Sequence, residues 1–182
     1  MDHQDHVNLL GPGISEPGGI WADFGSGRGA FTLALAELVG PEGMIFSVDK
    51  SQSALNQQQH SLRIRFPNVE VRYLKADFPG PVDLPTLDGL VVANALHFLK
   101  DKEKTVALLR DYLRPAGRFI VVEYNTDRGN HWVPYPFSYP IWQSIARGNG
   151  LQKTRLLATT PSSFLGEFYS AVSYVSTTGA GF

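Results

Sequence analysis

The chain has 182 residues, which fits one compact domain and leaves too little for two. Its 43% hydrophobic and 12% aromatic residues are enough for a sizeable core and exclude a disordered or collagen-like chain. With 16 Lys and Arg against 17 Asp and Glu, the net charge of -1 disfavours nucleic acid as a partner, and the absence of cysteine excludes disulfides, thiolate metal sites and a cysteine nucleophile.

The start of the chain shows no targeting signal. Residues 1–6 have neither the basic nor the apolar region of a secretion signal, and no later run approaches the ~18 apolar residues of a membrane span. We therefore expect a cytoplasmic protein without a membrane span. His3 and His6 lie on an end expected to be mobile, so we predict no metal site.

From Ile20 onward, short apolar runs alternate with segments of helical periodicity, which is typical of a parallel sheet flanked by helices. Ser51 or Ser53 is expected to cap the helix after the second strand, and Asp101 to open the helix after the fourth. A Pro-Ala-Gly turn over 115–117 is predicted to end that helix. The apolar runs predicted as strands cover residues 20–24, 44–48, 69–74, 87–93 and 118–124.

The C-terminal third has a different pattern. Residues 125–140 are rich in proline and aromatic side chains, and residues 141–146 have helical spacing. Two further strands, 155–158 and 168–175, are expected to form a terminal antiparallel pair. The predicted organisation is a lid or linker over residues 1–19 followed by one α/β domain over residues 20–182.

A glycine-rich loop, Asp23 to Gly29, lies between the first predicted strand and the helix after it. Gly25, Gly27 and Gly29 let a ligand approach backbone N–H groups at the helix N-terminus, and Ser26 lies among them. A nicotinamide site prefers G-x-G-x-x-G, whereas here the third glycine comes one residue early. The carboxylate of Asp23 would repel a pyrophosphate and favours a cationic ligand such as S-adenosylmethionine.

From about Ile20 to Tyr124 the chain resembles the class I S-adenosylmethionine-dependent methyltransferases, in particular the small type found in ubiquinone and menaquinone biosynthesis. The resemblance implies a Rossmann-like fold with a seven-stranded sheet, mostly parallel and with an antiparallel terminal strand. It implies S-adenosylmethionine as cofactor, with Asp49 at the ribose and Asp77 at the adenine. The predicted cofactor-binding residues are Asp23, Gly25, Ser26, Gly27, Gly29, Asp49, Lys50, Ala76, Asp77, Phe78 and Asn94.

The methyl acceptor is expected beyond the ends of the fourth and fifth strands, because ligands of open α/β sheets bind at the strand C-termini. A general base is needed only for an acceptor that is protonated at neutral pH. Structural roles stay open as well: a histidine at a strand-to-helix junction can serve as a hydrogen-bonded support, and Glu123 can neutralise Arg118 or Arg155. The candidate catalytic residues are His97, His131 and Tyr124.

Two segments are candidates to enclose the site. In the loop over residues 131–139, Trp132 and Tyr135 are predicted to wall a flat or apolar acceptor, with a packed crossing loop as the alternative. Near the N-terminus, Val7, Leu9 and Leu10 are predicted to fold over the cofactor as a short lid.

We therefore expect an S-adenosylmethionine-dependent methyltransferase that acts on a small-molecule acceptor, with O-, C- and N-methylation all open. The short chain leaves little material for an acceptor pocket, so a homodimer is one way to complete it. The alternatives are a non-catalytic S-adenosylmethionine-binding module and a nicotinamide-dependent oxidoreductase.

Overall fold

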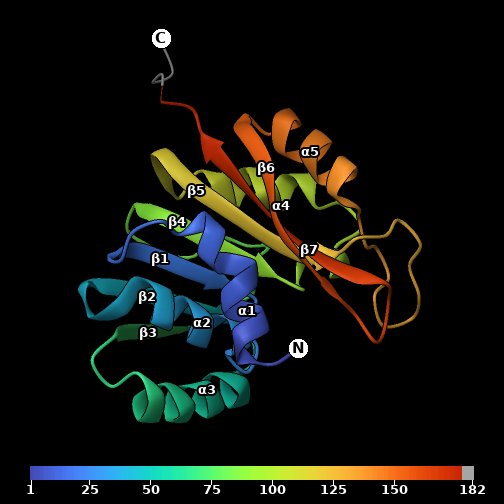
Figure 1. Cartoon of the computed structure of the whole chain (residues 1–182). Coiled ribbons are helices and arrows are strands. Elements are labelled where there is room, and N and C mark those ends of the chain that lie inside the picture. The colour runs from blue at the N-terminus through green and yellow to red at the C-terminus, as the bar shows by residue number, and fades with distance from the viewer. Residues whose placement is uncertain (178–182) are drawn as a thin grey trace.

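The computed structural model describes residues 1–177, which form a seven-stranded sheet covered by helices on both faces (Figure 1). The strand order is β3-β2-β1-β4-β5-β7-β6. Only β7 is antiparallel to its neighbours β5 and β6, so six strands run in one direction, which confirms the predicted fold class. The strands are β1 (Gly19–Phe24), β2 (Gly43–Asp49), β3 (Glu70–Lys75), β4 (Leu87–Ala93), β5 (Leu113–Tyr124), β6 (Leu151–Pro161) and β7 (Glu167–Val175).

The helices divide between the two faces of the sheet because alternate strand residues point to opposite sides. Trp21 and Val91 face one side, where they pack with α1, α2 and α3, and Ala22 and Leu90 face the other, where they pack with α4 and α5. Within residues 1–177, no helix is both long and apolar enough to cross a membrane. The helices are α1 (His3–Leu10), η1 (Gly11–Gly13), α2 (Ala30–Val39), η2 (Gly40–Glu42), α3 (Gln52–Arg65), η3 (Leu96–Phe98), α4 (Glu103–Arg110) and α5 (Tyr139–Gly148).

The N-terminal segment is folded onto the body of the domain. Leu9 and Leu10 of α1 are fully buried in the core shared with α2 and the sheet. His3 Nε2 lies 2.7 Å from Glu37 Oε2, and the His6 ring packs edge-on against Phe31, so both histidines contact α2. The first ten residues are therefore part of the fold and not a loose appendage. Over residues 1–177 no group of three or more His, Asp or Glu side chains is placed to hold a metal ion.

Several element boundaries differ from the sequence-based expectation. The Pro-Ala-Gly turn over 115–117 lies inside β5, because Leu113 already pairs with Leu87 of β4 before the register shifts. Ala116 has φ of 60°, which accommodates that shift. The last helix before this strand, α4, begins at Glu103 and not at Asp101, and β6 extends well beyond the predicted 155–158.

Candidate functional site

A cavity of about 290 Å³ lies at the C-terminal ends of β1, β2, β3 and β4. These parallel strands end along one edge of the sheet, so the loops that follow them meet there. The cavity combines two carboxylates, an ammonium, an amide and several apolar groups. Its lining residues are Gly25, Asp49, Lys50, Asp77, Phe78, Pro79, Asn94, Ala95, Phe98 and Leu99.

Two glycines of the loop stand where the surrounding protein leaves no space for a side chain. Gly25 has φ of 70°, and a Cβ atom there would lie 2.7 Å from Ala95 Cβ. Gly29 has φ of 85°, and a Cβ atom there would lie 2.5 Å from Gln58 Cβ. Both positions combine a left-handed backbone with close neighbours, so only glycine fits without rearrangement.

Asp49 joins the end of β2 to the glycine loop. Its Oδ2 accepts a hydrogen bond from the Gly27 N–H at 2.8 Å, and its Oδ1 accepts one from the Ser51 N–H at 2.7 Å. A carboxylate oxygen can accept more than one hydrogen bond, so each oxygen keeps capacity for a ligand donor. The carboxylate is thus fixed in orientation and available to the cavity.

A buried network supports the loop from behind. The Gln58 amide nitrogen donates to Ser26 Oγ and to the Gly27 carbonyl, both at 3.0 Å, and the Ser47 hydroxyl donates to Gln58 Oε1 at 2.9 Å. Ser26 therefore holds the loop through Gln58 and is absent from the cavity lining. Gln58 could not be predicted from the sequence, because α3 carries several polar residues at similar spacing and nothing local marks this one as buried.

Asp23 occupies a different position from the one expected. Its side chain is 1% exposed, and its Oδ2 accepts a 2.6 Å hydrogen bond from the Thr32 hydroxyl of α2. Burial raises the pKa of Asp23 from 3.8 to about 7; the Thr32 hydrogen bond opposes this rise and the nearby Asp49 charge adds to it. The carboxyl group lies behind the glycine loop, outside the set of residues that line the cavity.

The predicted adenine and strand-end residues meet at the cavity. Lys50, Asp77 and Phe78 line it, whereas Ala76 packs toward the core and its N–H donates to the Asp49 carbonyl. Asn94 lines the opposite wall with φ of 52°, and its Oδ1 atom is buried without a hydrogen-bond partner in the structure. Buried polar atoms normally have a partner, so this oxygen is an acceptor still available to a hydrogen-bond donor.

A buried pair of a histidine and a carboxylate, His97 and Glu123, lies beside this cavity. His97 Nδ1 is 2.7 Å from Glu123 Oε2, and Glu123 Oε1 accepts hydrogen bonds from the Leu96 and His97 N–H groups. The Tyr124 ring lies 5.9 Å from the His97 ring. Burial and the Glu123 charge raise the pKa of Tyr124. Glu123 therefore pairs with His97 at this edge of the sheet, and not with Arg118 or Arg155 as the sequence left open.

The loop between β5 and α5 projects past this edge of the sheet (Figure 1). The Tyr135 N–H donates to the His97 carbonyl at 2.9 Å, which ties the loop to η3. Trp132 is 70% exposed and Tyr135 is 42% exposed, while His131 is exposed and contacts the Trp132 ring. Among the described residues, none from this loop lines the 290 Å³ cavity.

A match to a known protein family covers most of the chain. A family model described as a methyltransferase domain matches residues 16–148. The chain belongs to the methyltransferase domain family. This match confirms the resemblance to class I S-adenosylmethionine-dependent methyltransferases inferred from the glycine loop and the strand ends.

Curated relatives of this methyltransferase domain are named for a specific reaction. The ubiquinone/menaquinone biosynthesis C-methyltransferase of Idiomarina loihiensis is 31% identical over 104 residues, which cover 57% of this chain and 41% of that protein. The protein of the same name from Teredinibacter turnerae is 31% identical over 112 residues, covering 60% and 44%. The chain thus matches less than half the length of these relatives.

Solved structures share the fold over nearly the whole chain. A SAM-dependent methyltransferase from Aquifex aeolicus superposes with a TM-score of 0.69 at 20% identity, covering 96% of this chain and 94% of that one. The 1,6-didemethyltoxoflavin-N1-methyltransferase of Burkholderia thailandensis, solved with bound 1,6-didemethyltoxoflavin and S-adenosylhomocysteine, superposes with a TM-score of 0.74 at 19% identity, covering 96% of this chain and 78% of that one. At these identities the likeness establishes the Rossmann-like methyltransferase fold.

Proposed function

We propose that this methyltransferase domain binds S-adenosylmethionine in the 290 Å³ cavity and transfers its methyl group to a small, largely apolar acceptor. The observation that carries the proposal is the Asp49 carboxylate, which is held by the Gly27 and Ser51 N–H groups at the rim of a glycine-lined cavity. When bound, S-adenosylmethionine supplies an electrophilic methyl group.

The residues present fit this cofactor. The spare acceptor capacity of Asp49 suits the two ribose hydroxyls, and Phe78 supplies an aromatic face beside the Asp77 carboxylate for an adenine and its amino group. The orphaned Asn94 Oδ1 suits a donor such as the ammonium of the methionine moiety. Gly25 provides the close backbone approach.

We assign the acceptor to the part of this edge of the sheet where the rings of His97, Phe98 and Tyr124 lie together. An ionised Glu123 can only accept a hydrogen bond, so Nδ1 of His97 donates to it and Nε2 is left as a proton acceptor. Phe98, whose ring lies 4.2 Å from the His97 ring, is 60% exposed and lines the cofactor cavity as well. An aromatic or otherwise flat acceptor could therefore contact Phe98 and lose its proton to His97.

Calorimetric titration tests the cofactor assignment. We expect S-adenosylmethionine and S-adenosylhomocysteine to bind, NAD to give no heat, and Asp49→Ala to weaken both adenosyl ligands by about tenfold or more through the loss of hydrogen bonds to a charged group. Asp83→Ala removes an equivalent charge from an exposed site outside the cavity and should change nothing. Binding of NAD alone, or equal effects of both variants, would contradict the proposal.

Methyl transfer is tested separately, with a panel of phenolic and quinol-type acceptors. His97→Gln should lower turnover by about 10²-fold or more while S-adenosylhomocysteine affinity stays unchanged. Cofactor binding without transfer to any acceptor would favour a non-catalytic binding module. A homodimer that completes the acceptor site stays a prediction, which sedimentation with and without acceptor would check.

A further inference from the structure

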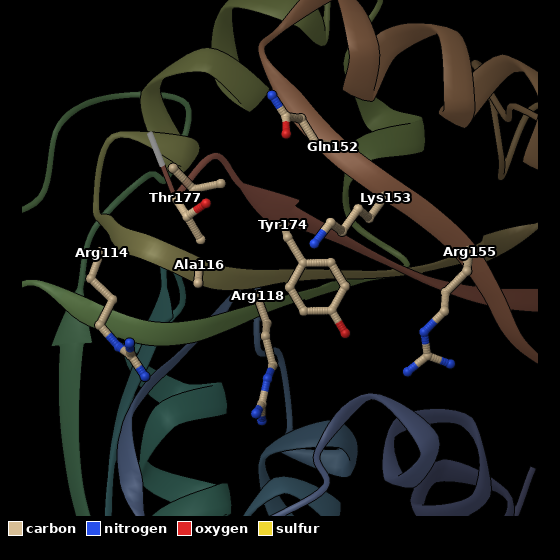
Figure 2. A pocket seen from close by; sticks show the side chains of 9 residues that line it. Arg114, Ala116, Arg118, Gln152, Lys153, Arg155, Tyr174 and Thr177 are labelled. Carbon is tan, nitrogen blue, oxygen red and sulfur yellow. The ribbon is translucent and has the colours of Figure 1, made fainter. Parts of the chain in front are cut away.

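A second and larger cavity, of about 540 Å³, lies at the opposite edge of the sheet from the cofactor site (Figure 2). It is formed where β5 and β6 begin and where β7 ends. No motif in the sequence predicts a role for this region. The lining residues are Arg114, Ala116, Arg118, Gln152, Lys153, Arg155, Tyr174, Val175 and Thr177.

The charge of this cavity has one sign. Four of its lining side chains are cationic, and within the described part of the chain no carboxylate lines it. Arg114 is neutralised, because its Nε lies 2.6 Å from Asp88 Oδ1. Arg118, Lys153 and Arg155 form no ion pair among residues 1–177, so three unpaired cations line this cavity. The carboxylates of Glu16 and Asp88 line a smaller adjoining cavity that Arg118 also borders.

The backbone holds these cations in place. One additional residue of β6 is accommodated between the pairs Gln152 with Tyr174 and Arg155 with Val172. Lys153 lies in this bulge with φ of 51°, a conformation that L-residues rarely adopt. Bulges re-aim side chains, and Figure 2 shows the Lys153 side chain above the Tyr174 ring, with Arg118 on one side of that ring and Arg155 on the other.

The arginines are also anchored through their own contacts. The Arg155 guanidinium donates to the Pro12 carbonyl at 2.9 Å, and the Arg118 guanidinium lies 6.0 Å over the Trp21 ring and donates to Ser15 Oγ at 3.4 Å. These contacts each use only part of a guanidinium that has five N–H donors. The remaining donors are pre-oriented, which reduces the entropy lost when an anion binds.

We propose that this cavity is a binding site for a phosphate-bearing organic ligand. Arg118, Lys153 and Arg155 would contact the phosphate oxygens, because guanidinium and ammonium groups form strong charge-assisted hydrogen bonds with phosphate. Tyr174, which lies opposite Arg118 across the β5–β7 ladder, and Val175 offer an aromatic and an apolar surface for the organic part. A volume of about 540 Å³ exceeds what a bare phosphate needs and falls in the range of small-ligand sites.

The proposal is independent of the cofactor assignment, and its test keeps the two apart. Pyrophosphate and ribose 5-phosphate, which lack adenine, are titrated into the full chain by calorimetry in the presence of S-adenosylhomocysteine. We expect saturable binding that weakens with added salt. Lys153→Gln should weaken it by about tenfold, the effect of losing a charged hydrogen bond. Lys104→Gln, on the exposed surface of α4, is the matched control and should have no effect.

Two further arms identify the source of the phosphate. Vesicles of phosphatidylcholine with phosphatidylglycerol, compared with phosphatidylcholine alone, test a lipid headgroup by co-sedimentation, and binding lost in Lys153→Gln would support the site with a lipid as its ligand. Tighter, Lys153-dependent binding of an oligothymidine would overturn the proposal in favour of a nucleic-acid surface. Absence of saturable binding to soluble phosphates and vesicles alike, or an equal loss in Lys104→Gln, would also overturn it.

Discussion

Replacing Asp23 by asparagine tests how the buried carboxyl group affects stability. Burial raises its pKa from 3.8 to about 7. Between these pH values the unfolded chain has released the proton while the folded chain retains it, so the free energy of unfolding falls as the pH rises. Each pKa unit corresponds to about 1.36 kcal/mol, so the loss amounts to about 4 kcal/mol once the pH is above the folded-state pKa.

Asparagine keeps the shape of the side chain and can still accept a hydrogen bond from the Thr32 hydroxyl, but it cannot ionise. The stabilisation of Asp23→Asn relative to the unmodified chain should therefore be about 3 kcal/mol larger at about pH 8.5 than at about pH 5. Comparing the two pH values cancels any packing difference between the side chains.

Urea unfolding followed by circular dichroism at both pH values measures this difference. Asp83→Asn, an exposed aspartate on a loop, is the control and should show no pH-dependent gain. The reasoning is refuted if Asp23→Asn changes the free energy of unfolding by the same amount at both pH values, because the carboxyl would then be ionised in the folded chain throughout.

Four further substitutions, one of them with a matched control, test other parts of the structure. Leu9→Ala should lower the free energy of unfolding by about 2–5 kcal/mol, because the side chain is fully buried; a loss within error in a thermal or urea melt would mean that α1 is not docked in solution. Gly25→Ala should abolish S-adenosylhomocysteine binding in calorimetry, because its Cβ would clash in a left-handed backbone, whereas Gly148→Ala, which has open space around it, should bind normally. Trp132→Ala and Tyr135→Ala should each impair turnover while sparing cofactor affinity, and parallel loss of both quantities would show that the loop is structural.

The predicted N-terminal lid can be tested by deletion and by substitution. Deleting residues 1–10 removes Leu9 and Leu10 from the core, so the free energy of unfolding should fall together with any change in cofactor affinity. Replacing Val7, which is only partly buried against that core, by serine separates the two effects. Unchanged affinity for S-adenosylhomocysteine in a folded Val7→Ser chain would count against the lid.

The strands and the glycine loop could be predicted because their signals are local. A buried parallel strand is a short, nearly continuous apolar run. The break at Gly25 marks the point where β1 ends. The position of Asp49 at the end of β2 followed from the same pattern, and the structure places it against Gly27 as a consequence.

The sequence by itself therefore determined the fold class and the edge of the sheet where the residues proposed to hold the cofactor gather, since both depend on periodicity and on short-range turns. The tertiary structure alone decided which polar groups face which. Gln58 supports a loop 31 residues away in sequence, Glu123 chooses His97 over the arginines, and Arg118, Lys153 and Arg155 converge only because β7 inserts between β5 and β6. The physical reason is that burial and charge pairing depend on contacts between segments that lie far apart in the chain, which residue spacing does not encode.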